Sequence, residues 1–210
     1  MQATARRTAA LVNALTGEAA APAPATIAAL LREHGESTDF SDSSKSGKPE
    51  GTGAPAKASA PAKAGAPATA GASESAIALS ATDVAEMRSA ALLLREVFTA
   101  DGTGPAAEAL NRLLRRTAGT LRLTSHDGAS PWHPHLDSDD DAPWGEWFLA
   151  SSCLCLMALI WHHQRPPGGV CASSTCDNVY LALGSGLPRR YCSRRCATRE
   201  RVAAHRRSQP

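Results

Sequence analysis

Residues 170–207 read VCASSTCDNVYLALGSGLPRRYCSRRCATRERVAAHRR and contain four of the six cysteines in this 210-residue chain. Four residues separate the first two cysteines, three separate the last two, and fifteen lie between the pairs. Two short loops that each supply two thiolates are typical of one tetrahedral Zn²⁺ site. A segment of about forty residues has too little core to fold alone, and thiolate coordination of zinc supplies on the order of 10 kcal/mol. The spacing predicts one structural Zn²⁺ on Cys171, Cys176, Cys192 and Cys196, with two disulfides as the alternative.

Between the cysteine pairs the sequence predicts a β-hairpin, in which residues 179–183 pair with residues 189–191 across a glycine-rich turn at 184–186. Ser193 is a good N-cap for a helix that runs to about Arg207. Most of its arginines fall on one side of a helical wheel, and the opposite side carries Cys196, Ala197, Ala203 and Ala204. We expect the cysteine and alanine side to pack on the hairpin and the metal.

The C-terminal helix is strongly basic, since eight arginines and one acid lie between Arg189 and Arg207. A guanidinium group suits phosphate oxygens because its planar fork donates in pairs and stays charged. The predicted partner is therefore DNA. The predicted phosphate contacts are Arg189, Arg190, Arg194, Arg195, Arg199, Arg201 and Arg206. A solvated helix face, an RNA or acidic-protein contact, and a zinc-built protein-interaction module are the alternatives.

The upstream sequence predicts a mainly helical domain. Apolar residues recur at helical spacing in residues 26–34, Ser80 with Asp83 begins a second helix, and Pro105 suits the first turn of a third. Residues 120–124 alternate as a strand does, and residues 144–163 form the most hydrophobic helix. The expected fold class is α+β: a mainly helical N-terminal domain with a short strand element, plus a small C-terminal β-hairpin and helix that bind zinc.

Composition divides the chain into four parts. Residues 41–76 are mostly Ala, Pro, Gly, Ser and Lys, and cannot bury enough apolar area to offset the entropy of ordering them. We expect a disordered insertion there. It separates residues 1–40 from residues 77–167, which together form the helical domain, and residues 168–210 form the zinc module.

The cysteine usage favours a reducing cytoplasm. The N-terminus mimics a signal peptide only faintly, because Asn13 interrupts a short apolar stretch. The apolar run at 147–161 has fifteen residues, fewer than the roughly 18 to 20 needed to span a bilayer. We therefore expect a buried helix with Cys153 and Cys155 as buried thiols, and no membrane partner.

A second polar cluster lies at residues 126–141. Histidine and carboxylate together can hold an ion that acidifies water, which would suit a metal-dependent hydrolase. However, His133 and His135 flank Pro134 on a segment predicted to be irregular, without the helical geometry of an HExxH site. A structural loop and a ligand- or metal-sensing pocket are the other interpretations, and we expect no enzyme activity. The candidate pocket residues are His126, Trp132, His133, His135 and Asp137.

The chain resembles the CGNR zinc-finger family in three C-terminal segments: CASSTC at 171–176, NVYL at 178–181 and RRYCSRRCATRERVAAHRR at 189–207. Upstream, ALVNAL at 10–15 and LSATDVAEMRSAALLLREVF at 79–98 are similar to the ABATE-type domain found in that family. Members of the family are regarded as stress-responsive transcription regulators.

The resemblance implies zinc-ligand roles for the four cysteines. The family's Cys-Gly-Asn-Arg motif appears as Cys196-Ala197-Thr198-Arg199, so Arg199 takes the place of the motif's arginine, and the second cysteine pair is one residue closer than usual. The implied function is a one-component regulator associated with the nucleoid. Its helical domain would sense a small-molecule effector or form a homodimer, and its zinc finger would bind DNA.

Overall fold

A computed structural model describes residues 1–17, 22–34, 77–117, 119–126, 128, 130–184 and 189–209. The insertion predicted to be disordered, 41–76, lies outside the described residues, as do Asp127 and the turn residues 185–188. The division of the chain into domains stays a prediction.

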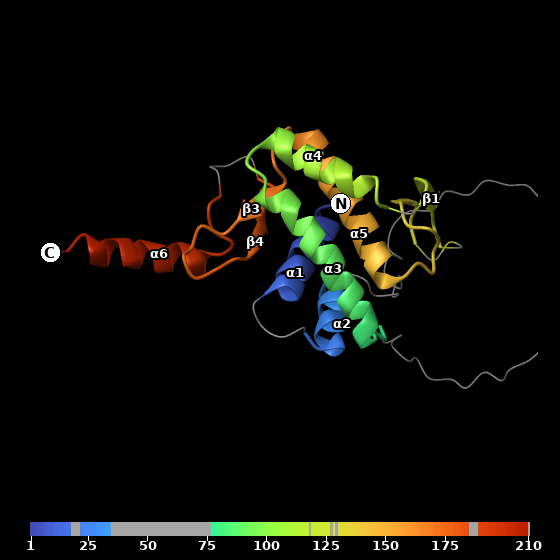
Figure 1. Ribbon diagram of the computed structural model, residues 1–210, viewed down its shortest axis with the longest axis horizontal. Coiled ribbons are helices and arrows are strands. Elements are labelled where there is room, and N and C mark those ends of the chain that lie inside the picture. The colour runs from blue at the N-terminus through green and yellow to red at the C-terminus, as the bar shows by residue number, and fades with distance from the viewer. Residues whose placement is uncertain are drawn as a thin grey trace, which may run out of the picture.

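The described residues form a helical body with two small sheets and a projecting C-terminal helix (Figure 1). The body contains α1 (Gln2–Thr16), α2 (Pro24–Glu33), α3 (Ala81–Thr99), α4 (Thr103–Leu114) and α5 (Trp144–His163). Strands β1 (Arg122–Thr124) and β2 (His133–His135) form one antiparallel pair, and β3 (Gly168–Val170) and β4 (Val179–Leu181) form the other. Helix α6 (Arg194–Arg207) follows. The predicted α+β class is confirmed.

The capping signal at the start of α3 is confirmed. The Ser80 hydroxyl accepts a hydrogen bond from the Asp83 amide at 3.1 Å, and the Asp83 carboxylate accepts one from the Ser80 amide at 2.7 Å. These two bonds satisfy amides that the first helical turn leaves without partners. The cap fixes the register of α3, whose apolar face packs against α1, α4 and α5 at the centre of the body.

Helix α5 is a core helix. Its twenty residues are long and apolar enough, by length and composition alone, to cross a bilayer. Its buried residues, however, share one core with α1, α3 and α4. Cys153 and Cys155 are buried there, as predicted, and burial raises the pKa of these thiols to about 12 and about 11. They are therefore neutral thiols at physiological pH.

The strand predicted at 120–124 exists as β1, over residues 122–124, and its partner lies in a segment that was not predicted to be a strand. Residues 133–135, predicted to be irregular, form β2, with Arg122 opposite His135 and Thr124 opposite His133. Proline is tolerated in β2 because a two-stranded ribbon leaves each strand one free edge. Successive side chains of a strand point to opposite faces, so His133 and His135, two residues apart, lie on one face of the ribbon. Leu121 and Leu123 are 60% and 65% exposed, so their side of β1 faces solvent.

The hairpin predicted between 179–183 and 189–191 is wrong. Strand β4 pairs instead with β3, and residues 189–191 form no strand, although the Arg190 carbonyl accepts a hydrogen bond from the Ala172 amide at 2.8 Å. A Cβ on Gly168 would lie 1.8 Å from the Tyr180 carbonyl oxygen, so only glycine allows this close pairing. In the sequence, Pro166, Pro167, Gly168 and Gly169 indicate the end of the preceding helix and the start of the zinc module, but not a strand.

The β3–β4 hairpin is joined to the helical body. Val179 and Leu181 are buried in the same core as the helices. The Asn13 side chain of α1 donates to the Val179 carbonyl at 3.0 Å and accepts from the Val179 amide at 2.7 Å. Arg95 of α3 donates to the Asp177 carbonyl at 2.5 Å. These contacts fix the position of the loop between β3 and β4 relative to α1 and α3.

Replacing Gly168 with alanine should destabilise the protein by roughly 1–3 kcal/mol, because the added methyl group must push Tyr180 and β4 away. Urea denaturation followed by circular dichroism measures this change. The control is Gly104→Ala, since nothing lies within 4 Å of a Cβ built at Gly104. It should be neutral or stabilising by about 0.4–1 kcal/mol. Equal midpoints for the two variants would contradict the close pairing.

Candidate metal centre and arginine surface

The four cysteines that the spacing singled out converge on one point. Their sulfur atoms all lie within 4.8 Å of one another. The Sγ atoms of Cys176 and Cys192 are 3.6 Å apart, and those of Cys192 and Cys196 are 3.7 Å apart. Zinc–sulfur bonds of about 2.3 Å in a tetrahedron place neighbouring sulfurs about 3.8 Å apart. A disulfide needs about 2.05 Å, and all six cysteines are free. The arrangement fits one structural Zn²⁺ rather than two disulfides.

Two short segments present the sulfurs. Cys171 directly follows β3, and a turn in which the Cys176 amide donates to the Ser173 carbonyl at 3.0 Å brings back Cys176. Cys192 and Cys196 flank the first turn of α6. That turn is capped by Ser193, as predicted, since its hydroxyl accepts from the Cys196 amide at 3.2 Å. A helix start thus supplies the second pair of ligands.

Donors around the sulfurs suit thiolates. The Cys192 amide donates to the Cys171 sulfur at 3.4 Å, and the Arg199 guanidinium donates to the Cys196 sulfur at 3.3 Å. The Ser193 hydroxyl lowers the pKa of Cys196 to about 7, whereas burial raises the pKa of Cys192 to about 12. Four thiolates around Zn²⁺ would carry a net charge of about −2. The Cys192 amide and the Arg199 guanidinium partly offset that charge.

Arg199 and Glu200 hold α6 against the loop between β3 and β4. The Arg199 guanidinium also donates to the Thr175 hydroxyl, and one Glu200 oxygen accepts from the Ser173 hydroxyl at 2.9 Å and the Ser174 amide at 3.1 Å. These hydrogen bonds, above all the one from Ser173, lower the pKa of the Glu200 carboxyl group. The structure therefore gives Arg199, predicted as a DNA contact, a role inside the zinc module.

Beyond its first turn, α6 projects away from the body (Figure 1). Cys196 is its only buried residue, and α6 contacts no other helix or strand within the described part of the chain. The predicted packing of its alanine side is wrong: Ala197 and Ala203 are half-buried and Ala204 is exposed. Alanine methyl groups bury too little apolar area to hold a helix against a surface. The zinc ligands and the loop contacts therefore anchor α6 at one end only.

The predicted DNA-contacting arginines fall into two groups. Arg189 donates to the Tyr191 carbonyl at 2.8 Å and lies over the Tyr180 ring at 5.5 Å, so it, like Arg199, makes internal contacts. All seven are exposed, and Arg190 is stacked at 5.8 Å on Tyr191. The second group, whose side chains make no hydrogen bond within the described part of the chain, is Arg190, Arg194, Arg195, Arg201 and Arg206.

An open cleft of about 810 Å³ lies between the zinc module and α1. Among the described residues, its lining includes five arginines and no acid. Arg189, Arg195 and Arg199 were predicted to bind DNA, whereas Arg6 and Arg165 were not, because no local pattern connects them to the module. Arg165 donates to the Ala182 carbonyl at 3.0 Å, which keeps it beside β4. The cleft is a strongly cationic surface.

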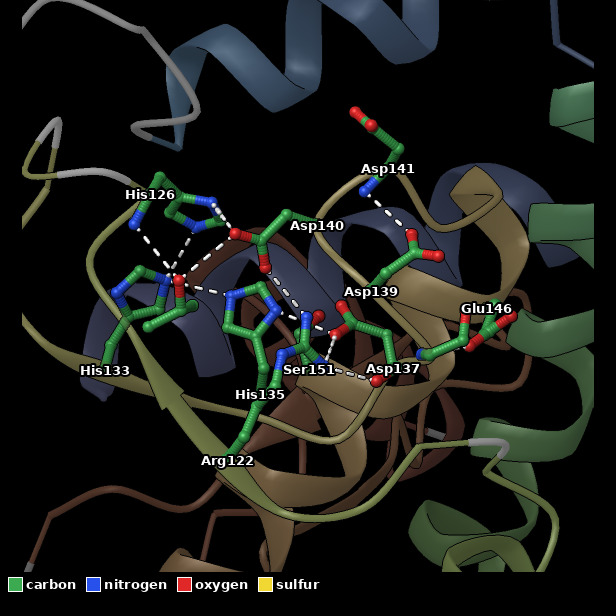
Figure 2. A network of polar contacts seen from close by, with 12 residues as sticks. Arg122, His126, His133, His135, Asp137, Asp139, Asp140, Asp141, Glu146 and Ser151 are labelled. Carbon is green, nitrogen blue, oxygen red and sulfur yellow. Dashed lines mark hydrogen bonds and ion pairs between the residues drawn. The ribbon is translucent and has the colours of Figure 1, made fainter. Parts of the chain in front are cut away.

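The second polar cluster is also assembled (Figure 2). The rings of His126, His133 and His135 lie close together, and buried Asp137 contacts His135. All four line a separate cavity of about 440 Å³. Trp132, predicted with them, is 73% exposed and is not part of that lining.

Comparisons with known proteins agree with the C-terminal geometry. The family model for the CGNR zinc finger matches residues 169–209, which include all four cysteine ligands and α6. No curated protein matches the chain. Residues 169–209 are therefore a zinc-finger domain of the CGNR type, and a zinc finger is a binding module rather than a catalytic one.

Changing both Cys192 and Cys196 to serine should abolish zinc binding at the four-cysteine site, because two of four ligands are lost. Substituting cobalt(II) for zinc makes the measurement specific, since thiolate-to-cobalt charge transfer absorbs only when sulfur binds the metal. The control is Cys155→Ser, a cysteine outside the site whose partner Thr8 can bond a hydroxyl instead. Charge-transfer absorption that survives in the double variant would contradict the assignment.

Proposed function

We propose that the protein is a DNA-binding transcription regulator that depends on zinc. The observation that carries the proposal is the cationic surface made by the projecting helix α6 and the arginine cleft at its base. Six exposed arginines follow one another along α6, and the described residues that line the adjoining cleft include no acid. The formal net charge of the whole chain is only +2, so this is a local concentration of charge.

Such a surface suits a phosphate backbone. Double-stranded DNA carries one negative charge per roughly 1.7 Å of helix axis, and arginines that neutralise phosphates release bound counterions. Arg194, Arg195, Arg201 and Arg206 are free of the internal bonds that occupy Arg189 and Arg199 in the described structure, so they are the proposed phosphate contacts, together with Arg190. In this proposal Arg189 and Arg199 help mainly by holding the zinc module in shape.

The composition of α6 favours DNA over the alternative of a protein-interaction module. Protein interfaces depend on apolar and aromatic anchors that are buried at their centre. Helix α6 offers one exposed large apolar residue, Val202, among charged and small ones. An acidic protein would have to bind through charge alone.

The helical body is the proposed sensing or dimerising part, in keeping with its resemblance to the ABATE-type domain. Asn13 and Arg95 bind the hairpin that carries the first two zinc ligands, so a change in the position of α1 or α3 would reach the finger directly. We place the protein in the cytoplasm, on nucleoid DNA.

The zinc-loaded full chain should bind duplex DNA with an affinity that falls steeply as salt rises. Five phosphate contacts give a slope of log K against log salt of roughly −4.5. Fluorescence anisotropy with a labelled duplex measures the slope. Arg201→Ala with Arg206→Ala should reduce its magnitude by about 1.8, since two contacts are lost.

The matched control removes two exposed arginines at the end of α4, Arg115→Ala with Arg116→Ala, and should leave the slope unchanged. Absence of duplex binding at low salt by protein that holds zinc would exclude the proposal. An equal loss in both double variants would show that only the total charge matters and not the surface of α6.

A further inference from the structure

Three imidazole rings meet at one point beside β1 and β2, at the side of the body away from α6 (Figures 1 and 2). The Nε2 atoms of His126 and His133 are 3.2 Å apart, and those of His133 and His135 are 3.0 Å apart. His133 and His135 project from the same face of β2, and His126 follows β1. Each ring therefore turns its Nε2 toward the other two.

The outer nitrogen of each ring faces an oxygen that can only accept a hydrogen bond. His135 Nδ1 lies 2.8 Å from an Asp137 carboxylate oxygen, His126 Nδ1 lies 3.2 Å from an Asp140 oxygen, and His133 Nδ1 lies 2.7 Å from the Pro131 carbonyl. Each Nδ1 must then carry the hydrogen. In the neutral rings this leaves three Nε2 lone pairs directed at one another.

Lone pairs at these separations repel unless a proton or a metal ion lies between them, and one proton can join only one pair of the three nitrogens. Zinc–nitrogen bonds of about 2.0–2.1 Å in a tetrahedron place neighbouring nitrogens about 3.3 Å apart, close to the two distances observed. Metal-binding histidines almost always donate their other N–H to a carboxylate or a carbonyl, which fixes the tautomer and the ring orientation. All three rings have such a partner.

The oxygens that orient the rings are themselves held. Arg122 bonds Asp137 at 3.0 Å and Asp140 at 2.8 Å, and Thr124 donates to Asp140 at 3.1 Å. Asp137 is 2% exposed. A Cβ on Gly119 would lie 1.9 Å from the Asp137 carbonyl, so the backbone packs tightly at this point.

His126 adds an independent observation. Its φ angle is 48°, in the left-handed region that side chains other than glycine rarely adopt. This conformation costs roughly 1–2 kcal/mol, and it persists only where the surrounding structure imposes it. Here the strained backbone brings the His126 ring to those of His133 and His135.

We propose that His126, His133 and His135 bind a divalent transition-metal ion through their Nε2 atoms, separate from the zinc finger, with a coordination position open to the adjoining cavity. Three neutral imidazoles suit zinc, cobalt, nickel or copper, whereas magnesium and calcium prefer oxygen ligands. The three histidines would occupy three of the four coordination positions of a tetrahedral ion. The fourth is available to water or to a small ligand.

The cavity indicates what that ligand would be. It is lined on one side by the three histidines and on the other by α1 and α5, including Arg7, Trp147 and Ser151. The Arg7 guanidinium is buried, lies 4.5 Å over the Trp147 ring and contacts the Ser151 hydroxyl at 3.3 Å. Burial lowers its pKa to about 10, so it remains a cation at neutral pH. A metal ion with an open coordination position on a cavity of about 440 Å³ favours a small anionic ligand.

The test is metal stoichiometry on the full chain, purified without a polyhistidine tag. Equilibrated with cobalt(II), the wild-type protein should bind two equivalents, only one of which shows thiolate charge transfer. His133→Ala should lose the other equivalent and keep the thiolate band. The control is His162→Ala, an exposed histidine outside the trio, and should keep both. One equivalent in the wild type, all of it bound by thiolate, would overturn the proposal.

A second variant guards against misfolding of His133→Ala. Asp140→Asn keeps all three ligands and removes only the carboxylate beside His126, so it should weaken the second equivalent on the order of 10-fold. Unchanged affinity of the second equivalent would contradict the role given to Asp140 and the proposed geometry. Azide, a small anion, should shift the cobalt d–d bands of the histidine site. Bands that do not respond would overturn the open position.

Discussion

Convergence of four thiolates is the constraint on which the C-terminal part of this structure depends. Helix α6 buries only Cys196, and its remaining contacts are the bonds of Arg199 and Glu200 to one loop. That burial is too small to offset the entropy of ordering a fourteen-residue helix together with the loops before it. Coordination of a zinc ion supplies the missing free energy. The arginines of α6 can therefore project from an anchored base and stay exposed.

The zinc finger is nevertheless not an independent appendage. Strand β4 lies in the hydrophobic core, and the Asn13 side chain bonds both backbone groups of Val179 as a neighbouring strand would. The other end of α1 carries Thr4 and Arg7, which line the cavity beside the three histidines. One helix thus extends from the β3–β4 hairpin to the cavity beside the three histidines. A helix transmits displacement along its axis because its backbone hydrogen bonds make it stiff, so α1 is the direct physical connection between the two ends of the body.

Arginine has three different roles in this chain. Arg122 is held between two carboxylates and orients the groups that contact histidine rings. Arg199 donates to a zinc-ligand sulfur, and Arg165 donates to the Ala182 carbonyl beside the cleft. The exposed arginines of α6 make few such bonds and leave their charge at the surface. A count of arginines in the sequence cannot separate these roles, since each depends on which acceptor lies nearby.

The amino-acid sequence alone determined the zinc ligands, the cap of α3 at Ser80 and Asp83, and the start of α6 at Ser193, because each depends on spacing within a few residues of chain. It did not determine that β4 pairs with β3, because the close approach at Gly168 becomes apparent only when Tyr180 lies against it. Nor did it determine that Arg6 and Arg165 join the cleft, and it grouped His126 with His133 and His135 as candidate pocket residues without fixing how their rings meet. Those arrangements bring together segments that are separated along the chain, and packing of the body and pairing of β1 with β2 set the distances between them.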